Sequence, residues 1–250
     1  MHRQRRQRYL QALGIEGWRL RAAAHAPAES DAEPQAAAAR SDDGRGKAPE
    51  TPRPDSIANP SGDTAGLDWD GLAARIRACT RCELHRGRTQ AVVGAGVRAA
   101  DLMVVGEGPG AEEDRRGEAF VGRAGRLLDE MLLAIGCSRT GSVFIANIVK
   151  CRPPGNRDPR PEEVAACEGY LRRQIDLVKP RVIAAVGRVA AQNLLGTQER
   201  LGAMRGREYE YQGTPVIVTY HPAYLLRSPQ DKRKAWADLK RVRARLEAGR

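Results

Sequence analysis

The sequence lacks any long apolar run. No apolar segment approaches the roughly 18 residues that a helix needs to span a bilayer. The N-terminus also has no apolar core of the kind that secretory signals carry. Both absences argue against an integral membrane protein or an exported one. We therefore expect a cytoplasmic protein that makes no contact with membranes.

Large apolar residues are nearly absent from residues 22–66 as well. Ile57 is the only large aliphatic residue of this segment, which contains no Phe, Trp or Tyr and is dominated by Ala, Pro, Ser, Asp, Gly and Glu. Such a segment cannot bury enough apolar surface to offset the entropy cost of ordering the chain. We predict a disordered linker at 22–66, between a short basic helical segment at 1–21 and a folded domain at 67–250.

The sequence has fewer acidic residues than basic ones. The chain carries 42 Lys plus Arg against 31 Asp plus Glu, a net charge of +11, which favours a polyanionic partner such as nucleic acid. An arginine-rich protein of another function would show the same total. Residues 1–21 place apolar side chains among six arginines. This segment could dock on DNA or a partner protein, pack on its own domain, or act as an organelle transit peptide.

Strand and helix patterns alternate along the folded domain. Apolar runs predict four main strands, and periodic apolar residues predict helices between them, one capped by Asp68 and a last one starting near Pro229. The predicted strands are 101–106, 143–149, 181–186 and 215–220, and the predicted inner helices are 122–135, 161–178 and 187–195. This alternation is typical of an α/β fold with a parallel sheet that is covered on both faces.

Four of the five cysteines form two pairs. Cys79 and Cys82 make a CxxC motif, whereas Cys151 and Cys167 flank a proline-rich loop and the first turns of a helix. In a cytoplasmic chain, such cysteines are more often metal ligands or free thiols than disulfides. Four thiolates suit either zinc or an iron–sulfur cluster. Cys137 has no partner at ligand spacing, so we expect it to play no part.

A glycine-rich acidic loop, GEGPGAEED, follows the first predicted strand. The loop lacks the GxGxxG pattern and the P-loop lysine, which argues against a dinucleotide or nucleotide site. Its glycines would instead let the backbone approach a flat ligand closely. The acidic residues, Glu107 and Glu113 among them, could hold Mg²⁺ for nuclease chemistry or simply form a solvated turn.

Three further side chains are candidates for the same site. Phe120 lies between the acidic loop and the helix at 122–135, and could stack on a planar base. Asn147 ends the second predicted strand and could offer a donor and an acceptor to a pyrimidine edge. His221 directly follows the fourth strand. Each could instead be an ordinary core residue, but three such groups at one sheet edge predict a pocket.

Taken in order, three stretches resemble motifs of the family 4 uracil-DNA glycosylases, the iron–sulfur type found in bacteria and archaea. They are GEGPGAEEDRRGEAFVGRAGRLLD, NIVKCRPPGNRDPRPEEVAAC and HPAYLLR, and the resemblance covers about residues 67–245. Gly108 stands where the commoner family motif, GEAPG, has alanine. A sister group that forms a covalent histidine adduct carries a basic KRRIH insertion, which this chain lacks.

The resemblance implies a three-layer α/β/α fold with a central four-stranded parallel sheet. It also implies an enzyme that hydrolyses the N-glycosidic bond of uracil in DNA, releasing uracil and leaving an abasic site. A [4Fe–4S] cluster would be held by Cys79, Cys82, Cys151 and Cys167. The partner would be uracil-containing DNA, single- or double-stranded. Apart from the resemblance, we expect a monomer, with residues 1–21 as a candidate site for a protein partner. A non-catalytic iron–sulfur DNA-binding or scaffold protein on the same fold is the alternative.

The resemblance also assigns roles within the site. Phe120 would stack on the flipped uracil, Asn147 would read its edge, and His221 would donate to the pyrimidine O2 as negative charge grows there. Gly108 would belong to the uracil-binding set, and Glu107 and Glu113 are the candidates to position water or stabilise the sugar cation. The DNA-contacting candidates are Asn156, Leu225, Leu226 and Arg227, with either leucine able to fill the space that the base vacates.

Overall fold

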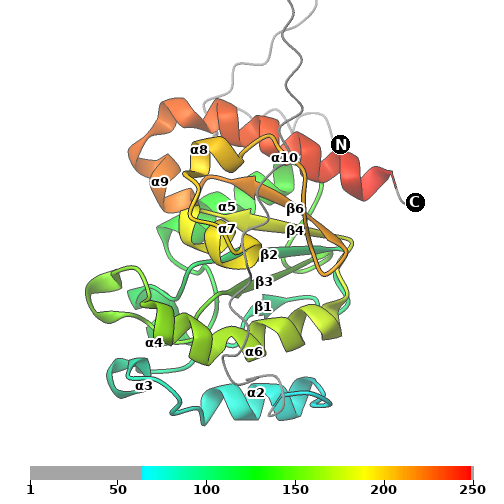
Figure 1. Ribbon diagram of the computed structural model, residues 1–250. Helices are drawn as coiled ribbons and strands as arrows, with labels where there is room; N and C mark the ends of the chain where they lie inside the picture. Colours follow the sequence, from blue (N-terminus) through cyan, green and yellow to red (C-terminus); the bar gives the residue numbers. More distant parts are fainter. Residues whose placement is uncertain (1–63, 249–250) are drawn as a thin grey trace, which may run out of the picture. The chain divides into compact units, whose positions relative to one another are not determined.

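The computed structural model describes residues 64–248 (Figure 1). The predicted basic segment at 1–21, and nearly all of the predicted linker at 22–66, lie outside the described residues. The ordered domain begins close to the predicted residue 67, since Thr64 is buried and its hydroxyl donates to the Gly169 carbonyl at 3.1 Å. Within the described residues, no helix has the length and apolar character needed to cross a membrane.

Six strands form one mixed sheet in the described part of the chain, in the order β1-β3-β2-β4-β6-β5. The four inner strands run parallel and correspond to the four predicted ones: β2 (Leu102–Gly106), β3 (Val143–Asn147), β4 (Val182–Val186) and β6 (Thr214–Thr219). The prediction of a four-stranded sheet was wrong at the edges, where β1 (Ala95–Gly96) and β5 (Tyr209–Tyr211) pair antiparallel. Strands of two and three residues are too short to show an apolar period.

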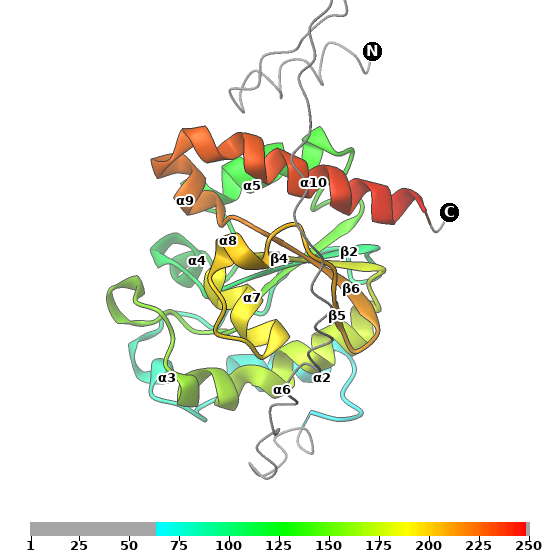
Figure 2. The ribbon, with the colours of Figure 1, turned by 45° about the horizontal axis from the view of Figure 1, so that its top comes forward.

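Helices cover both faces of this sheet, as predicted (Figure 2). One face packs against α2 (Trp69–Arg77), α6 (Pro161–Val178) and α7 (Arg188–Leu195). The other face packs against α5 (Arg123–Ala134), α9 (Pro222–Arg227) and α10 (Lys232–Glu247). Every residue of β2, β3 and β4 is buried, because a sheet sandwiched between helix layers exposes neither face. The α/β/α architecture is confirmed.

Local signals in the sequence set several helix ends. The Asp68 carboxylate accepts from the Gly71 amide at 2.8 Å and caps α2 as predicted. The predicted C-terminal helix begins as a 3₁₀ turn, η3 (Pro229–Asp231), before α10. The acidic loop differs from the prediction, since it contains the short helix α4 (Ala111–Arg116), which ends at left-handed Gly117. The remaining short helices are α3 (Leu84–Gly87), η2 (Pro154–Asn156) and α8 (Leu201–Met204).

Candidate functional site

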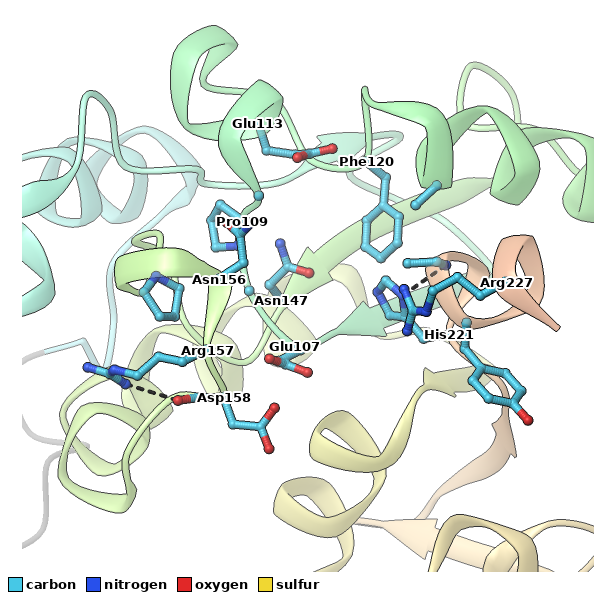
Figure 3. Close-up of a pocket in the computed structure, with 16 residues that line it drawn as sticks. Glu107, Pro109, Glu113, Phe120, Asn147, Asn156, Arg157, Asp158, His221 and Arg227 are labelled. Carbon is cyan, nitrogen blue, oxygen red and sulfur yellow. Dashed lines mark hydrogen bonds between the residues drawn. The ribbon is translucent and has the colours of Figure 1, made fainter.

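A cavity of about 460 Å³ opens at the carboxyl ends of the parallel strands (Figure 3). Most of the predicted site residues line it, although they are far apart in the sequence. These are Glu107, Gly108, Glu113, Phe120, Asn147, Asn156, His221 and Arg227. The fold brings them together because parallel strands present their carboxyl ends at one edge of the sheet.

The floor of the cavity is formed where β2 and β3 end side by side. Gly106 pairs with Asn147 in the parallel register, and a Cβ added at Gly106 would lie 2.5 Å from Asn147 Oδ1 and 2.7 Å from the Phe120 ring. Only glycine leaves room for both side chains. Asn147 is 2 % exposed, and its buried Oδ1 has no hydrogen-bond partner among the described residues. A buried amide oxygen without a donor is costly, so it marks a place where a ligand N–H fits.

Glu113 fixes the turn that presents Phe120. Its Oε1 accepts from the amides of Val121 at 2.9 Å and Gly122 at 3.0 Å. Phe120 itself has a left-handed backbone, with φ of 54°, a conformation that costs a non-glycine residue free energy. A Cβ at Gly125 would lie 1.8 Å from the Phe120 carbonyl oxygen, so glycine is required there too. One carboxylate oxygen of Glu113 is therefore engaged in positioning the aromatic ring.

Arg139, a residue that the sequence analysis missed, holds the same turn from the other side. Its guanidinium donates to the carbonyls of Ala119 at 3.0 Å and Phe120 at 2.7 Å, and its Nε donates to Asp129 Oδ1 at 2.8 Å. Arg139 thus ties the turn to α5. It lies between a helix and a strand, outside every motif, so no sequence signal identified it.

His221 begins α9 with a defined ring orientation. Its Nδ1 accepts from the Ala223 amide at 3.1 Å, which places the ring proton on Nε2. Burial, with a smaller contribution from the nearby Arg227 cation, lowers the pKa of His221 to about 4. The imidazole is therefore neutral at physiological pH. Its ring centroid lies 5.5 Å from that of Phe120, and left-handed Gly187 at the end of β4 allows it to pack closely.

Glu107 lies across the cavity from His221 (Figure 3). Burial, and to a smaller extent the Asp158 carboxylate, raise the pKa of the Glu107 carboxyl to about 7 against the opposing effect of the Arg188 cation. Asp158, which was not predicted, forms an ion pair with Arg188 and lines the same cavity. A carboxyl group whose pKa is shifted towards neutrality is typical of catalytic sites.

The two leucines of the HPAYLLR segment differ in exposure. Leu225 is 1 % exposed and packs in the core, whereas Leu226 is 38 % exposed. Leu226 is thus the apolar side chain of α9 that reaches the surface. It lies beside Arg123 and Arg126 of α5, in a second, open cavity. Of the two wedge candidates, only Leu226 is free to enter another molecule.

The four paired cysteines line one narrow cavity between α2, α6 and the residues that follow β3. All are free thiols in this structure, and Cys137 lies in the core on the opposite face of the sheet. The Arg88 guanidinium donates to Cys151 Sγ at 3.0 Å, and the Lys150 amide donates to Cys167 Sγ at 3.4 Å. Burial raises the pKa of the Cys167 thiol to about 12.

The sequence allows two kinds of metal centre at these cysteines, a zinc ion or an iron–sulfur cluster. Within residues 64–248, no three His, Cys, Asp or Glu side chains converge as they would around a single metal ion. A zinc ion needs its four ligands about 2.3 Å from one point. An iron–sulfur cluster uses four thiolates alone, distributed around a larger body. Four cysteine side chains that line one cavity suit a cluster held by thiolates alone.

Comparisons with known proteins agree with this geometry. Residues 93–240 match the model described as "Uracil DNA glycosylase superfamily". The chain is 43% identical over 181 residues to a type-4 uracil-DNA glycosylase of Archaeoglobus fulgidus, covering 69% of this chain and 90% of that protein. It is 47% identical over 171 residues to the Pyrobaculum aerophilum protein of that name, covering 65% and 87%. For the Thermotoga maritima protein, identity is 46% over 159 residues, covering 63% and 82%.

Proposed function

This chain belongs to the uracil DNA glycosylase superfamily, among its type-4 members, and from that premise we propose how its pocket excises uracil from DNA. The enzyme hydrolyses the N-glycosidic bond of deoxyuridine, releasing uracil and leaving an abasic site. The observation that carries the mechanism is the buried Asn147 amide, whose Oδ1 lacks a donor among the described residues, in a cavity closed by Phe120 and His221.

Uracil is selected by hydrogen bonds along its edge. The Asn147 Oδ1 accepts from uracil N3–H while its Nδ2 donates to O4, and Phe120 stacks on the ring. Cytosine presents an unprotonated N3 and an amino group at these positions, so both contacts would become mismatched. A site that rejects a base by leaving buried polar groups unpaired can discriminate strongly. Gly106 and Gly108 let the base approach the backbone.

Bond cleavage sends the glycosidic electron pair into the base. Negative charge grows on uracil O2, where His221 Nε2–H donates a hydrogen bond from a neutral ring. The sugar develops oxocarbenium character, which the Glu107 carboxylate stabilises. Water then adds to C1′, and its proton leaves to Glu107. Between the two predicted acids, Glu107 takes this role, because one oxygen of Glu113 already holds the turn that carries Phe120.

The base must leave the DNA stack before it enters this pocket. Leu226 fills the vacated space, in the way that apolar wedges unstack bases elsewhere. Arg227 and Asn156 line the pocket, and in this proposal they contact the DNA phosphates beside the flipped nucleotide. We propose that the protein does this as a cytoplasmic monomer, with residues 1–21 available to a protein partner.

The four cysteines would hold a [4Fe–4S] cluster. Held by these four cysteines, the cluster would supply a rigid anchor rather than an open site for substrate. It would pin the 151–167 segment, from which Pro153, Asn156, Arg157 and Asp158 reach the uracil pocket. The protein should then be brown and absorb at around 400 nm. Colourless protein with one bound zinc would overturn this assignment.

The deciding experiment uses a uracil-containing oligonucleotide. The cluster-loaded protein should release uracil, so that alkali then cleaves the strand at the abasic site. A matched thymine-containing strand should stay intact. An intact uracil strand would refute the glycosylase mechanism, and DNA binding without excision would favour the scaffold alternative.

A further inference from the structure

Lys150 lies fully inside the protein, between the cysteine cavity and the uracil pocket. Its side chain is 1 % exposed, and its Nζ donates to the Asn147 carbonyl at 2.7 Å and to Gln174 Oε1 at 2.7 Å. Gln174 is 0 % exposed, and its own amide nitrogen donates to the Val93 carbonyl at 2.6 Å. The ammonium group is therefore held rigidly by buried partners.

The charge of Lys150 has no carboxylate to balance it in the part of the chain that the structure describes. Both of its hydrogen-bond acceptors are neutral amide oxygens. Removing an ammonium group from water costs several kcal/mol unless an anion compensates. Lys150 also lines the cysteine cavity, where Cys151 and Cys167 are the titratable groups that act on it. A negatively charged group in that cavity would supply the missing compensation.

We propose that Lys150 is the fixed counter-charge of the iron–sulfur cluster and the positioning residue that ties the cluster to Asn147. This inference rests on the proposed cofactor and deepens it. Four thiolates give the cluster site a net negative charge, which a buried cation stabilises, and charge close to a cluster sets its reduction potential. Through the contact of Nζ with the Asn147 carbonyl, the same cation fixes the end of β3, from which the Asn147 side chain reads the base.

Only a few residues along the chain separate the cysteine cavity from the uracil pocket. Asn147, Lys150 and Cys151 lie within five consecutive residues, so any shift of the cluster reaches the uracil pocket through this segment. Arg88 is a second cation on the cluster side, but it contacts Cys151 Sγ and the Arg77 carbonyl rather than Asn147. Lys150 is therefore the cation that joins the two sites.

Two substitutions test the counter-charge. Lys150→Met removes the charge and keeps an unbranched apolar chain. Gln174→Glu keeps Lys150 and gives it a carboxylate partner of nearly the same shape, with loss of the hydrogen bond to the Val93 carbonyl. Both should lower the midpoint potential of the cluster, because each weakens the field that favours the reduced, more negative state. Arg86→Gln is the control: Arg86 lies four residues after Cys82 and carries the same charge, but its side chain is 72% exposed and pairs with Glu83 at 3.0 Å, so solvent and Glu83 screen it.

Kinetics test the positioning role. Lys150→Met should lower kcat/KM for uracil excision by roughly 10-fold to 100-fold, as is typical when outer-sphere partners are removed. Because Lys150 acts through Asn147, combining it with Asn147→Ala should add little further loss. Arg86→Gln should excise uracil at the wild-type rate.

Different outcomes test the counter-charge role of Lys150, its positioning role and the proposed cofactor. Unchanged midpoint potentials in both Lys150→Met and Gln174→Glu would overturn the counter-charge, and additive losses with Asn147→Ala would overturn the positioning role. A wild-type protein without iron would refute the cofactor first, before any variant is compared. A Lys150→Met protein that fails to load a cluster, with Gln174→Glu loaded at the wild-type potential, would also count against the inference.

Discussion

Replacing Glu107 by glutamine should stabilise the folded protein at pH 8 while it abolishes excision. Burial and the Asp158 carboxylate raise the pKa of Glu107 to about 7, from an ordinary value of 4.5. Between these pH values the folded state holds a proton that the unfolded state has lost. The wild type therefore loses stability as the pH rises from 4.5 to 7, and the loss is complete above the folded-state pKa. Glutamine carries no charge and has no such loss.

The size of this effect follows from the two pKa values. At about 1.36 kcal/mol per pH unit, their difference sets an upper limit of about 3 kcal/mol. Glu107 is only half-buried, so solvent screening reduces this figure to about 1–2 kcal/mol. The substituted glutamine keeps the shape and part of the hydrogen-bonding capacity of the acid, so packing should change little.

Urea unfolding followed by circular dichroism measures the effect directly. The free energy of unfolding of Glu107→Gln should exceed that of the wild type by about 1–2 kcal/mol at pH 8, and by much less at pH 5. Glu112→Gln is the matched control, because its exposed carboxylate pairs with Arg115, which lowers the pKa of Glu112, so this substitution should not stabilise. If the two free energies of unfolding differed equally at both pH values, or did not differ at pH 8, the raised pKa of Glu107 and its cause in burial would be refuted. In the wild type, kcat/KM should rise with pH through about 7, because the carboxylate form of Glu107 is the one that acts on the sugar and on water.

Three further predictions concern the remaining parts of the pocket. His221→Ala should lower kcat by roughly 100-fold with little change in DNA affinity, and equal rates would show that its donor role is wrong; because the pKa of His221 is about 4, protonation of this ring should not affect wild-type rates between pH 5 and 8. Arg139→Gln should slow excision in the wild type but hardly at all in a Phe120→Leu background, whereas additive losses would contradict the view that it acts through Phe120. Leu226→Ala should reduce excision from duplex DNA more than from single strands, and equal losses on both would argue against a wedge.

Much of the fold could be predicted because its strands are buried on both faces. The runs that became β2, β3, β4 and β6 are continuous and apolar, and a helical pattern follows each of the first three. The edge strand β5 escaped detection, since its three residues are partly or fully exposed and begin and end with tyrosines. Helix α4 was hidden because its sequence, AEEDRR, is charged nearly throughout and packs little apolar surface.

The site was predictable where a side chain directly follows a strand. Asn147 and His221 could be placed at one sheet edge from strand ends alone. Asp158 and Arg139 could not, because each is positioned by tertiary contacts: Asp158 by an ion pair with Arg188, 30 residues on, and Arg139 by the carbonyls of a turn that it follows by 19 residues. The role of Glu113 also depended on structure, since a carboxylate that accepts from two amides looks the same in sequence as a free one.

The side chains of the pocket are held by parts of the structure that differ in stability, so local unfolding should not release them all together. Glu107 and Asn147 follow or end inner strands, whose amides are expected to exchange with solvent only when the whole domain opens. Phe120 lies on a turn outside the sheet, held mainly by Arg139 and Glu113. Under mild denaturant, the turn should therefore open first, exchanging the Val121 and Gly122 amides while β2 and β3 stay protected. Excision would then be lost before the domain unfolds, because the stacking of Phe120 on the base is the first pocket contact to be lost.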